Sequence, residues 1–133
     1  MNRPAAPLVI RLHRATGLAI LACQKMLERV PEEQQERYVV FHEQRYCCSF
    51  YDPVEADPDY TEILMEVNAK AKTSVENMLH DVDAAEDEFL KRMRWRHLDE
   101  YFWAIKKQLL SKTYGIDWSS PEELTRLMYR LRS

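Results

Sequence analysis

The stretch "ATGLAILACQKML", residues 15–27, decides how the first part of this chain folds. Apolar residues recur before it at the spacing of a helix: Leu8, Val9, Leu12 and Ala15. Gly17 permits a sharp turn, so we expect one helix to end near Thr16 and a second helix to follow Gly17. We predict that the second helix buries one face: Ile20, Leu21, Met26 and Leu27.

The composition is that of a globular chain built mainly from helices. The 133 residues suffice for one domain, or for one domain with a small appended subdomain, with a core that needs no disulfides. Only two glycines occur, Gly17 and Gly115, whereas β-rich folds and phosphate-binding loops need more. The sequence therefore argues against an all-β fold, a P-loop and a Rossmann turn.

Charge, hydropathy and cysteines indicate the compartment. The net charge of -3 gives the chain no general attraction for nucleic acid. No apolar run reaches the roughly 18 residues that a membrane span needs, and basic residues interrupt the first apolar stretch too early for a signal peptide. Cys23, Cys47 and Cys48 are odd in number and two are adjacent, which suits reduced thiols. We therefore expect a cytoplasmic protein.

The segment "SFYDPVEADPDY", residues 49–60, separates two parts of the chain in this interpretation. Its two Asp-Pro pairs favour extended backbone before each proline. We interpret residues 49–58 as a linker that joins an N-terminal unit, residues 1–48, to residues 59–133, which can also pack with it as one domain.

Helical spacing on both sides of this segment predicts an all-α fold of five to six helices. Pro31 is expected to begin a third helix that includes "RYVVF". The C-terminal part is predicted to form a long helical hairpin and a short last helix, capped by Ser119 or Ser120 and with Pro121 in its first turn.

Residues that carry metal or nucleophilic chemistry do not form a recognised pattern. Glu76 and His80 are spaced to share a helix face, but the chain has no Glu-x-x-His and no cysteine pair at zinc spacing. Cys23 lies among apolar residues, where a free cysteine is usually a small core residue. We expect no catalytic residue, no metal and no cofactor.

Two further features remain as candidate interaction surfaces. Four basic residues surround Trp95 and could contact nucleic acid: Lys91, Arg92, Arg94 and Arg96. The acidic run "DVDAAEDE" precedes them, so we favour a solvated charged face instead. Trp95 and Trp103 are about two helical turns apart and could share a face that contacts another protein or a second copy of the chain.

The stretch "VIRLHRATGLAILACQKML", residues 9–27, resembles the first two helices of the ubiquitin-associated (UBA)-like domain at the start of bacterial elongation factor Ts. The matching positions are Val9, Leu12, Thr16, Gly17, Cys23, Lys25 and Leu27. Ala19 and Ala22 depart from the family in detail, and the Thr-Asp-Phe-Val signature of nucleotide exchange is absent. The resemblance thus implies a three-helix module and no exchange activity.

Such modules bind proteins, which gives the functional hypothesis. The resemblance implies that the turn at Thr16, Gly17 and Leu18 presents backbone and one apolar side chain to a partner. We therefore expect a non-catalytic adaptor or regulator, with a link to translation suggested by the resemblance alone. The alternatives are an RNA- or ribosome-contacting protein that uses residues 91–97, and a small helical enzyme or metal-binding protein.

Overall fold

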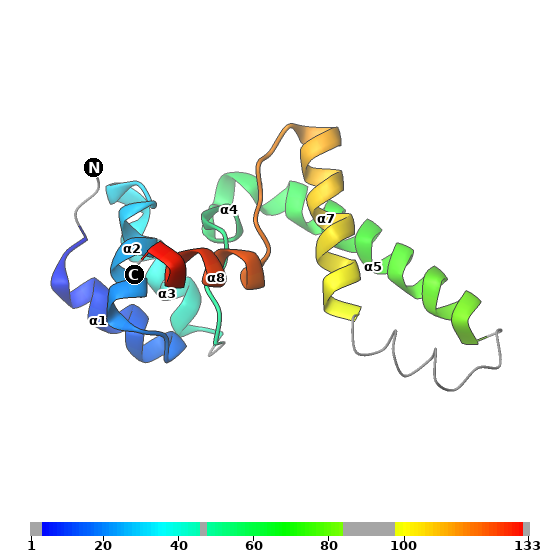
Figure 1. Ribbon diagram of the computed structural model, residues 1–133. Coiled ribbons are helices and arrows are strands. Elements are labelled where there is room, and N and C mark those ends of the chain that lie inside the picture. The colour runs from blue at the N-terminus through cyan, green and yellow to red at the C-terminus, as the bar shows by residue number, and fades with distance from the viewer. Residues whose placement is uncertain (1–3, 46–47, 84–97, 132–133) are drawn as a thin grey trace. The chain divides into compact units, whose positions relative to one another are not determined.

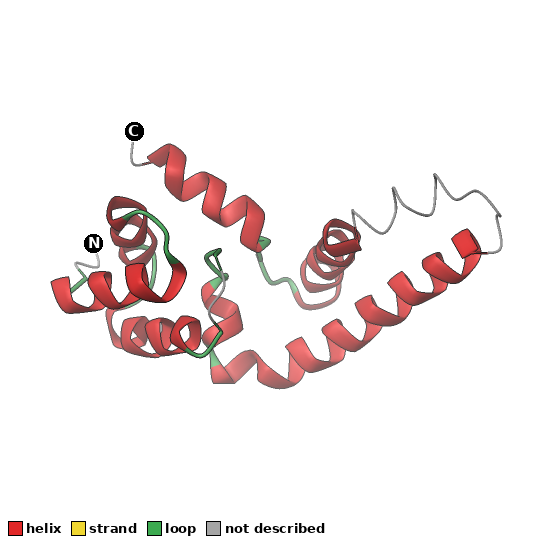
Figure 2. Ribbon diagram, turned by 90° about the horizontal axis from the view of Figure 1, so that it is seen from below, coloured by secondary structure: helices red, strands yellow, loops and turns green. Residues whose placement is uncertain are grey.

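The structure of the protein is a computed structural model, and it describes residues 4–45, 48–83 and 98–131 (Figure 1). Every regular element in this part of the chain is helical (Figure 2), so the all-α class is confirmed. The described residues contain seven α-helices rather than the five to six expected: α1 (Ala6–Thr16), α2 (Ile20–Glu28), α3 (Gln35–Glu43), α4 (Pro53–Ala56), α5 (Thr61–Asp83), α7 (Leu98–Tyr114) and α8 (Pro121–Leu131). Two short 3₁₀ turns, Glu32–Gln34 and Pro58–Tyr60, precede α3 and α5.

The chain divides into two compact units, and the division differs from the expected one. Unit 1 comprises Met1–Tyr60 together with Ser119–Ser133, and unit 2 comprises Thr61–Trp118. The last helix, α8, therefore belongs with the N-terminal helices and not with residues 59–133. Helical spacing predicts that α8 buries one face, but it contains no information about which helix covers that face.

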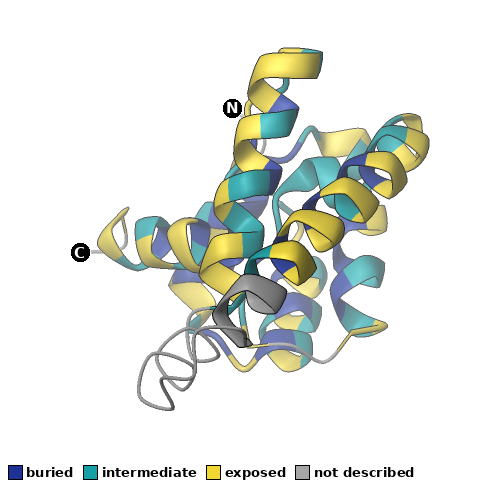
Figure 3. Ribbon diagram, turned by 90° about the vertical axis from the view of Figure 1, so that its right-hand side faces the viewer, coloured by how far each residue is buried: buried dark blue, intermediate teal, exposed yellow. Residues whose placement is uncertain are grey.

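Unit 1 is built on the turn between α1 and α2. The chain direction changes by 118° between these helices, and α1 packs against both α2 and α3 while α8 packs against α2. Their buried side chains form one core: Val9, Leu12, Leu18, Ala22, Cys23, Met26, Leu27, Val30, Tyr38, Val39, Phe50, Leu124 and Met128. Figure 3 shows buried and exposed positions interspersed along the helices, as expected where each helix buries one face.

The expected linker is part of unit 1, which corrects the prediction for residues 49–58. Phe50 is fully buried, and α4 begins within the segment because Asp52 caps it and Pro53 occupies its first turn. The Asp52 carboxylate accepts hydrogen bonds from the Val54 N–H (3.0 Å) and the Ser119 N–H (2.9 Å). The same carboxylate thus starts α4 and holds the residue that leads into α8.

The start of α8 follows the predicted capping rules. The Ser120 hydroxyl accepts a hydrogen bond from the Glu123 N–H at 3.2 Å and donates one to the Glu123 carboxylate at 3.2 Å. The bond from the Glu123 N–H is the side-chain cap typical of an N-cap serine, and Pro121 fills the first turn of α8. Leu124 and Met128 then point into the core of unit 1, where the Thr125 hydroxyl accepts a hydrogen bond from the Phe50 N–H.

Unit 2 contains the two long helices α5 and α7, which pack against each other as the predicted hairpin does. The buried residues of α5 lie at helical spacing: Leu64, Val67, Ala71 and Val75. Leu110 of α7 and Trp118 are also buried in this unit. Near the end of α7, the Tyr114 hydroxyl donates a hydrogen bond to Glu66 of α5 at 2.8 Å. Gly115 then follows the end of α7 in the left-handed conformation that glycine favours at a helix C-terminus.

Candidate functional site

The turn between α1 and α2 has the backbone geometry that Gly17 was expected to provide. Gly17 has φ 72° and ψ 5°, and its N–H donates to the His13 carbonyl at 2.8 Å, which closes the last turn of α1. No atom lies within 4 Å of the position that a Cβ at Gly17 would occupy. The glycine is therefore required by the backbone conformation and not by lack of space.

Thr16 and His13 satisfy the polar backbone groups of this turn. The Thr16 hydroxyl donates to the Leu12 carbonyl at 2.8 Å and accepts from the Leu18 N–H at 3.2 Å. His13 Nδ1 lies 2.6 Å from the Leu18 carbonyl oxygen. Because a carbonyl can only accept, Nδ1 carries the hydrogen. The threonine at this position thus has a structural function.

Cys23 completes the interior of the turn. Its thiol is fully buried and lies 3.7 Å from the Leu18 carbonyl oxygen and 4.0 Å from the Thr16 hydroxyl. Burial raises the pKa of the Cys23 thiol to about 11. Since the thiolate is the reactive form, Cys23 is suited to packing and not to nucleophilic attack at neutral pH.

The structure reverses two predictions about which apolar residues of the turn are exposed. Leu18, the expected contact for a partner, is only 8% exposed and belongs to the core, and Thr16 is also buried, at 3% exposed. Ile20 and Leu21, expected to be buried, are 50% and 56% exposed. Spacing gives Ile20 the same helix face as Leu27, but it does not show how far the neighbouring helices extend along that face.

Helix α8 contributes to this region, which the sequence did not reveal. The Tyr129 hydroxyl accepts a hydrogen bond from the Ala19 N–H at 3.0 Å, across 110 residues of sequence. Ala19 precedes the first residue of α2, so this bond places the C-terminal part of α8 beside the start of α2 (Figures 1 and 2). Arg130 and Leu131 follow Tyr129, and Leu131 is 46% exposed. No local pattern predicts such a contact.

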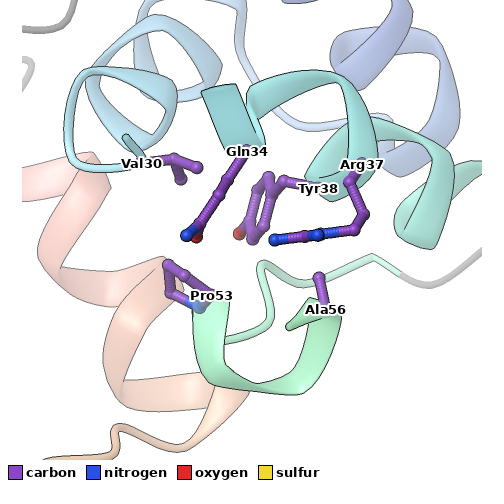
Figure 4. A pocket seen from close by; sticks show the side chains of 6 residues that line it. All are labelled: Val30, Gln34, Arg37, Tyr38, Pro53 and Ala56. Atoms are coloured by element: carbon purple, nitrogen blue, oxygen red, sulfur yellow. The ribbon is translucent and has the colours of Figure 1, made fainter. Parts of the chain in front are cut away.

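A concave feature of unit 1 lies between α3 and α4 (Figure 4). Gln34, Arg37 and Tyr38 extend toward Pro53 and Ala56 across a shallow crevice. The crevice leaves no room for a water molecule. It is therefore a packing seam.

His42, beside this seam, is held in its neutral form. Its Nδ1 donates to the Tyr38 carbonyl at 2.9 Å, and its Nε2 accepts from the Tyr51 N–H at 3.0 Å. Burial, with a smaller contribution from the charge of Arg45, lowers the pKa of His42 to about 4. Both nitrogens are engaged, so His42 has no free atom for acid–base catalysis.

The remaining candidate residues fall into two groups. Five lie outside the described residues: Lys91, Arg92, Arg94, Trp95 and Arg96. Trp103 lies half-buried on α7, two residues after Tyr101, which is 37% exposed. The side chain of His80 is also outside the described part, so the structure gives no distance between the side chains of Glu76 and His80.

Three further findings concern the class of protein: two come from the structure and one from comparison with known proteins. Within the described ranges, no group of three or more His, Cys, Asp or Glu side chains could hold a metal ion. None of the described helices is by itself long and apolar enough to cross a membrane. No protein-family model, curated protein or solved structure matches this chain.

Proposed function

We propose that this chain is a non-catalytic, cytoplasmic protein-binding module, an adaptor or regulator that contacts its partner through the turn between α1 and α2. The contact surface consists of Gly17, Ile20 and Leu21, called here the turn surface. The observation that carries the proposal is the exposure of Ile20 and Leu21, two adjacent large aliphatic side chains that are half exposed beside an open glycine. Contiguous exposed apolar side chains mark protein interaction sites, whereas single ones are normal on a protein surface.

The hydrogen bonds beneath the turn surface support this proposal. The polar groups of the turn are bonded to Leu12, His13, Thr16 and Tyr129. A surface held in this way loses little conformational entropy when it binds, which favours affinity. The same bonds explain why Thr16, Gly17 and Cys23 occur at their spacing.

The resemblance to the UBA-like domain of elongation factor Ts supports the same region. Modules of that kind use the turn after their first helix to contact proteins. In this chain the apolar contact would come from Ile20 and Leu21, because Leu18 is in the core. A connection with translation rests on the resemblance alone.

The two side chains that most resemble catalytic residues, those of Cys23 and His42, have structural roles, and this favours a binding function over catalysis. Cys23 is buried with a raised pKa, and both ring nitrogens of His42 are bonded to backbone groups. Each of these groups is explained by the packing of unit 1.

Site-specific crosslinking tests the proposal. Leu21 is replaced by a photoreactive phenylalanine analogue in the full chain, and Met65, which is 68% exposed in unit 2, is replaced in a matched control. After irradiation in a lysate of the source organism, mass spectrometry identifies the adducts. The partner found is then purified and titrated with the wild-type chain, Leu21→Glu and Met65→Glu.

We expect an adduct from position 21 that is absent from position 65, and at least tenfold weaker binding of Leu21→Glu, or about 1.4 kcal/mol. Circular dichroism must show the same helix content in all three chains. Equal affinity of Leu21→Glu and the wild type would show that the turn surface is not the binding site.

A further inference from the structure

The charges around the turn surface identify the chemistry of its partner. We infer that the turn surface binds an acidic amphipathic helix of another protein, with aliphatic side chains on Ile20 and Leu21 and carboxylates on Arg14 and Arg130. This inference rests on the proposed function, because it specifies the partner of the same surface.

Two arginines adjoin the turn surface. Arg14 is exposed on the last turn of α1, which ends at Thr16 directly before Gly17. Arg130 is exposed and follows Tyr129, whose hydroxyl bonds to the Ala19 N–H. Positive charge therefore adjoins Gly17 from α1 and the start of α2 from α8.

Neither arginine forms an ion pair with an acid in the part of the chain that the structure describes, whereas other basic residues nearby do. Arg11 is bound by Glu36 at 2.8 Å and by Glu43 at 2.7 Å. Lys25 pairs with Glu28 at 3.7 Å, and Arg126 pairs with Glu122 at 2.6 Å.

The acidic residues of α1, α2 and α8 do not offset the positive charge of Arg14 and Arg130. The sequence of α1, APLVIRLHRAT, contains no acid, and the single acid of α2 is Glu28, which already pairs with Lys25. The acids of α8 lie in its first turn, whereas Arg130 lies in its last turn. The turn surface is thus flanked by basic groups on a chain of net charge -3.

A surface of aliphatic residues beside two arginines is better suited to binding a protein segment than to binding nucleic acid. Nucleic-acid sites neutralise about 6–10 phosphates and stack bases on aromatic rings. The turn surface adjoins two arginines without a described ion pair, and its exposed side chains, Ile20 and Leu21, are aliphatic. Charge complementarity with apolar contact therefore favours an acidic, amphipathic partner.

The hydrogen bonding of the turn favours a helix as the form of that partner. An extended peptide gains affinity by adding a strand to free backbone groups. Here the N–H groups of Gly17, Leu18 and Ala19 are already bonded to His13, Thr16 and Tyr129. A helix satisfies its own backbone and presents side chains at positions i, i+3 and i+4, so it can bind with side chains alone.

Selection from a phage-displayed library of helix-forming peptides tests the inference. The full wild-type chain is the bait, and each enriched peptide is synthesised with a fluorescent label for anisotropy titrations. The variants are Leu21→Glu and the double charge reversal Arg14→Glu with Arg130→Glu. The matched control is Lys72→Glu with Lys112→Glu, which makes the same charge change at exposed residues of unit 2.

We expect enriched peptides of net negative charge with aliphatic residues at helical spacing. Their affinity should fall at least tenfold for Leu21→Glu and for Arg14→Glu with Arg130→Glu, less than twofold for the control, and further with added salt. Neutral or basic peptides that still depend on Leu21 would overturn the inference and leave the proposed function standing. Selection that yields no Leu21-dependent peptide would count against both.

A second copy of the chain is the competing occupant, and it has a separate readout. Sedimentation of the wild type as a dimer, with Leu21→Glu a monomer, would show that the turn surface is covered by another copy and would overturn the inference. A wild-type monomer that binds the acidic peptides is the result the inference requires.

Discussion

Mild acid is predicted to destabilise unit 1 through one residue, His42. Its Nε2 accepts a hydrogen bond from the Tyr51 N–H, and protonation would turn this acceptor into a donor that faces another donor. Tyr51 precedes Asp52, whose carboxylate caps α4 and binds the Ser119 N–H before α8. A proton on His42 therefore weakens the segment that joins α3, α4 and α8.

The lowered pKa gives the size and the direction of the effect. The unfolded chain takes up the proton near pH 6.5, whereas the folded chain does so only near pH 4. Between these values the unfolded state binds more protons. The contribution of neutral His42 to the free energy of unfolding is therefore complete above pH 6.5 and is lost as the pH falls toward 4. At about 1.4 kcal/mol for each pKa unit, the full loss is about 3 kcal/mol, of which about 2 kcal/mol falls between pH 7 and pH 5.

Urea unfolding between pH 7 and pH 5, followed by far-UV circular dichroism, measures this loss. The matched control is His42→Gln, which cannot titrate in this range and is expected to be less stable at pH 7 but nearly independent of pH. The buffer range avoids the carboxylates, because Arg11 lowers the pKa of Glu43 below its ordinary 4.5 and Tyr114 does the same for Glu66. Their contribution begins to be lost only below about pH 4.5.

The reasoning would be refuted by a wild type and a His42→Gln variant whose unfolding free energies change in parallel with pH. It would equally be refuted by an NMR titration of the His42 ring in the folded chain with a pKa near 6.5. Protection of the Tyr51 amide from hydrogen exchange, lost in His42→Gln, would verify the hydrogen bond that underlies the prediction.

Four other perturbations test the packing around the turn. Gly17→Ala should cost about 1 kcal/mol in urea unfolding, because an L-residue is strained at φ 72° although no neighbour obstructs the Cβ; no loss would contradict that conformation. Tyr129→Phe should cost about 1 kcal/mol in the same assay, since the Ala19 N–H loses its acceptor, and an unchanged midpoint would argue against the contact of α8 with the turn. Leu27→Ala should cost about 3 kcal/mol, because its side chain is fully buried, and a cost below about 1 kcal/mol would be incompatible with that burial. At about pH 8 a thiol reagent should modify exposed Cys48 in the folded chain and reach buried Cys23 only after denaturation, as peptide mapping would show; equal labelling would mean that Cys23 is accessible.

Local features of the fold could be predicted because neighbouring residues determine them. The turn at Gly17, the capping of α8 by Ser120 and the end of α7 at Gly115 each depend on backbone geometry within a few residues. The Asp-Pro pairs were predicted to hold extended backbone, and Asp52 and Asp57 have ψ of 139° and 117°. The error was the inference that such backbone forms a linker.

The turn that carries the candidate site was predicted, but the residues that it exposes were not. The turn is where the pattern placed it, yet Leu18 is buried and Ile20 and Leu21 are half exposed. Whether a side chain on a predicted face is covered depends on the ends of other helices. That information lies in residues far along the chain, such as Tyr129, whose hydroxyl meets the Ala19 N–H.

The sequence by itself therefore determined the class of fold, most of the helices and the sharp turn at Gly17, because these follow from periodicity and from local backbone preferences. Only the tertiary structure decided that α8 joins α2 in unit 1, that Phe50 fills the core and that Ile20 and Leu21 remain at the surface. The physical reason is that hydrophobic burial is not directional. An amphipathic helix must bury its apolar face against another element. Several apolar faces of the chain have the same chemistry, so the packing partner is not settled until the whole chain folds.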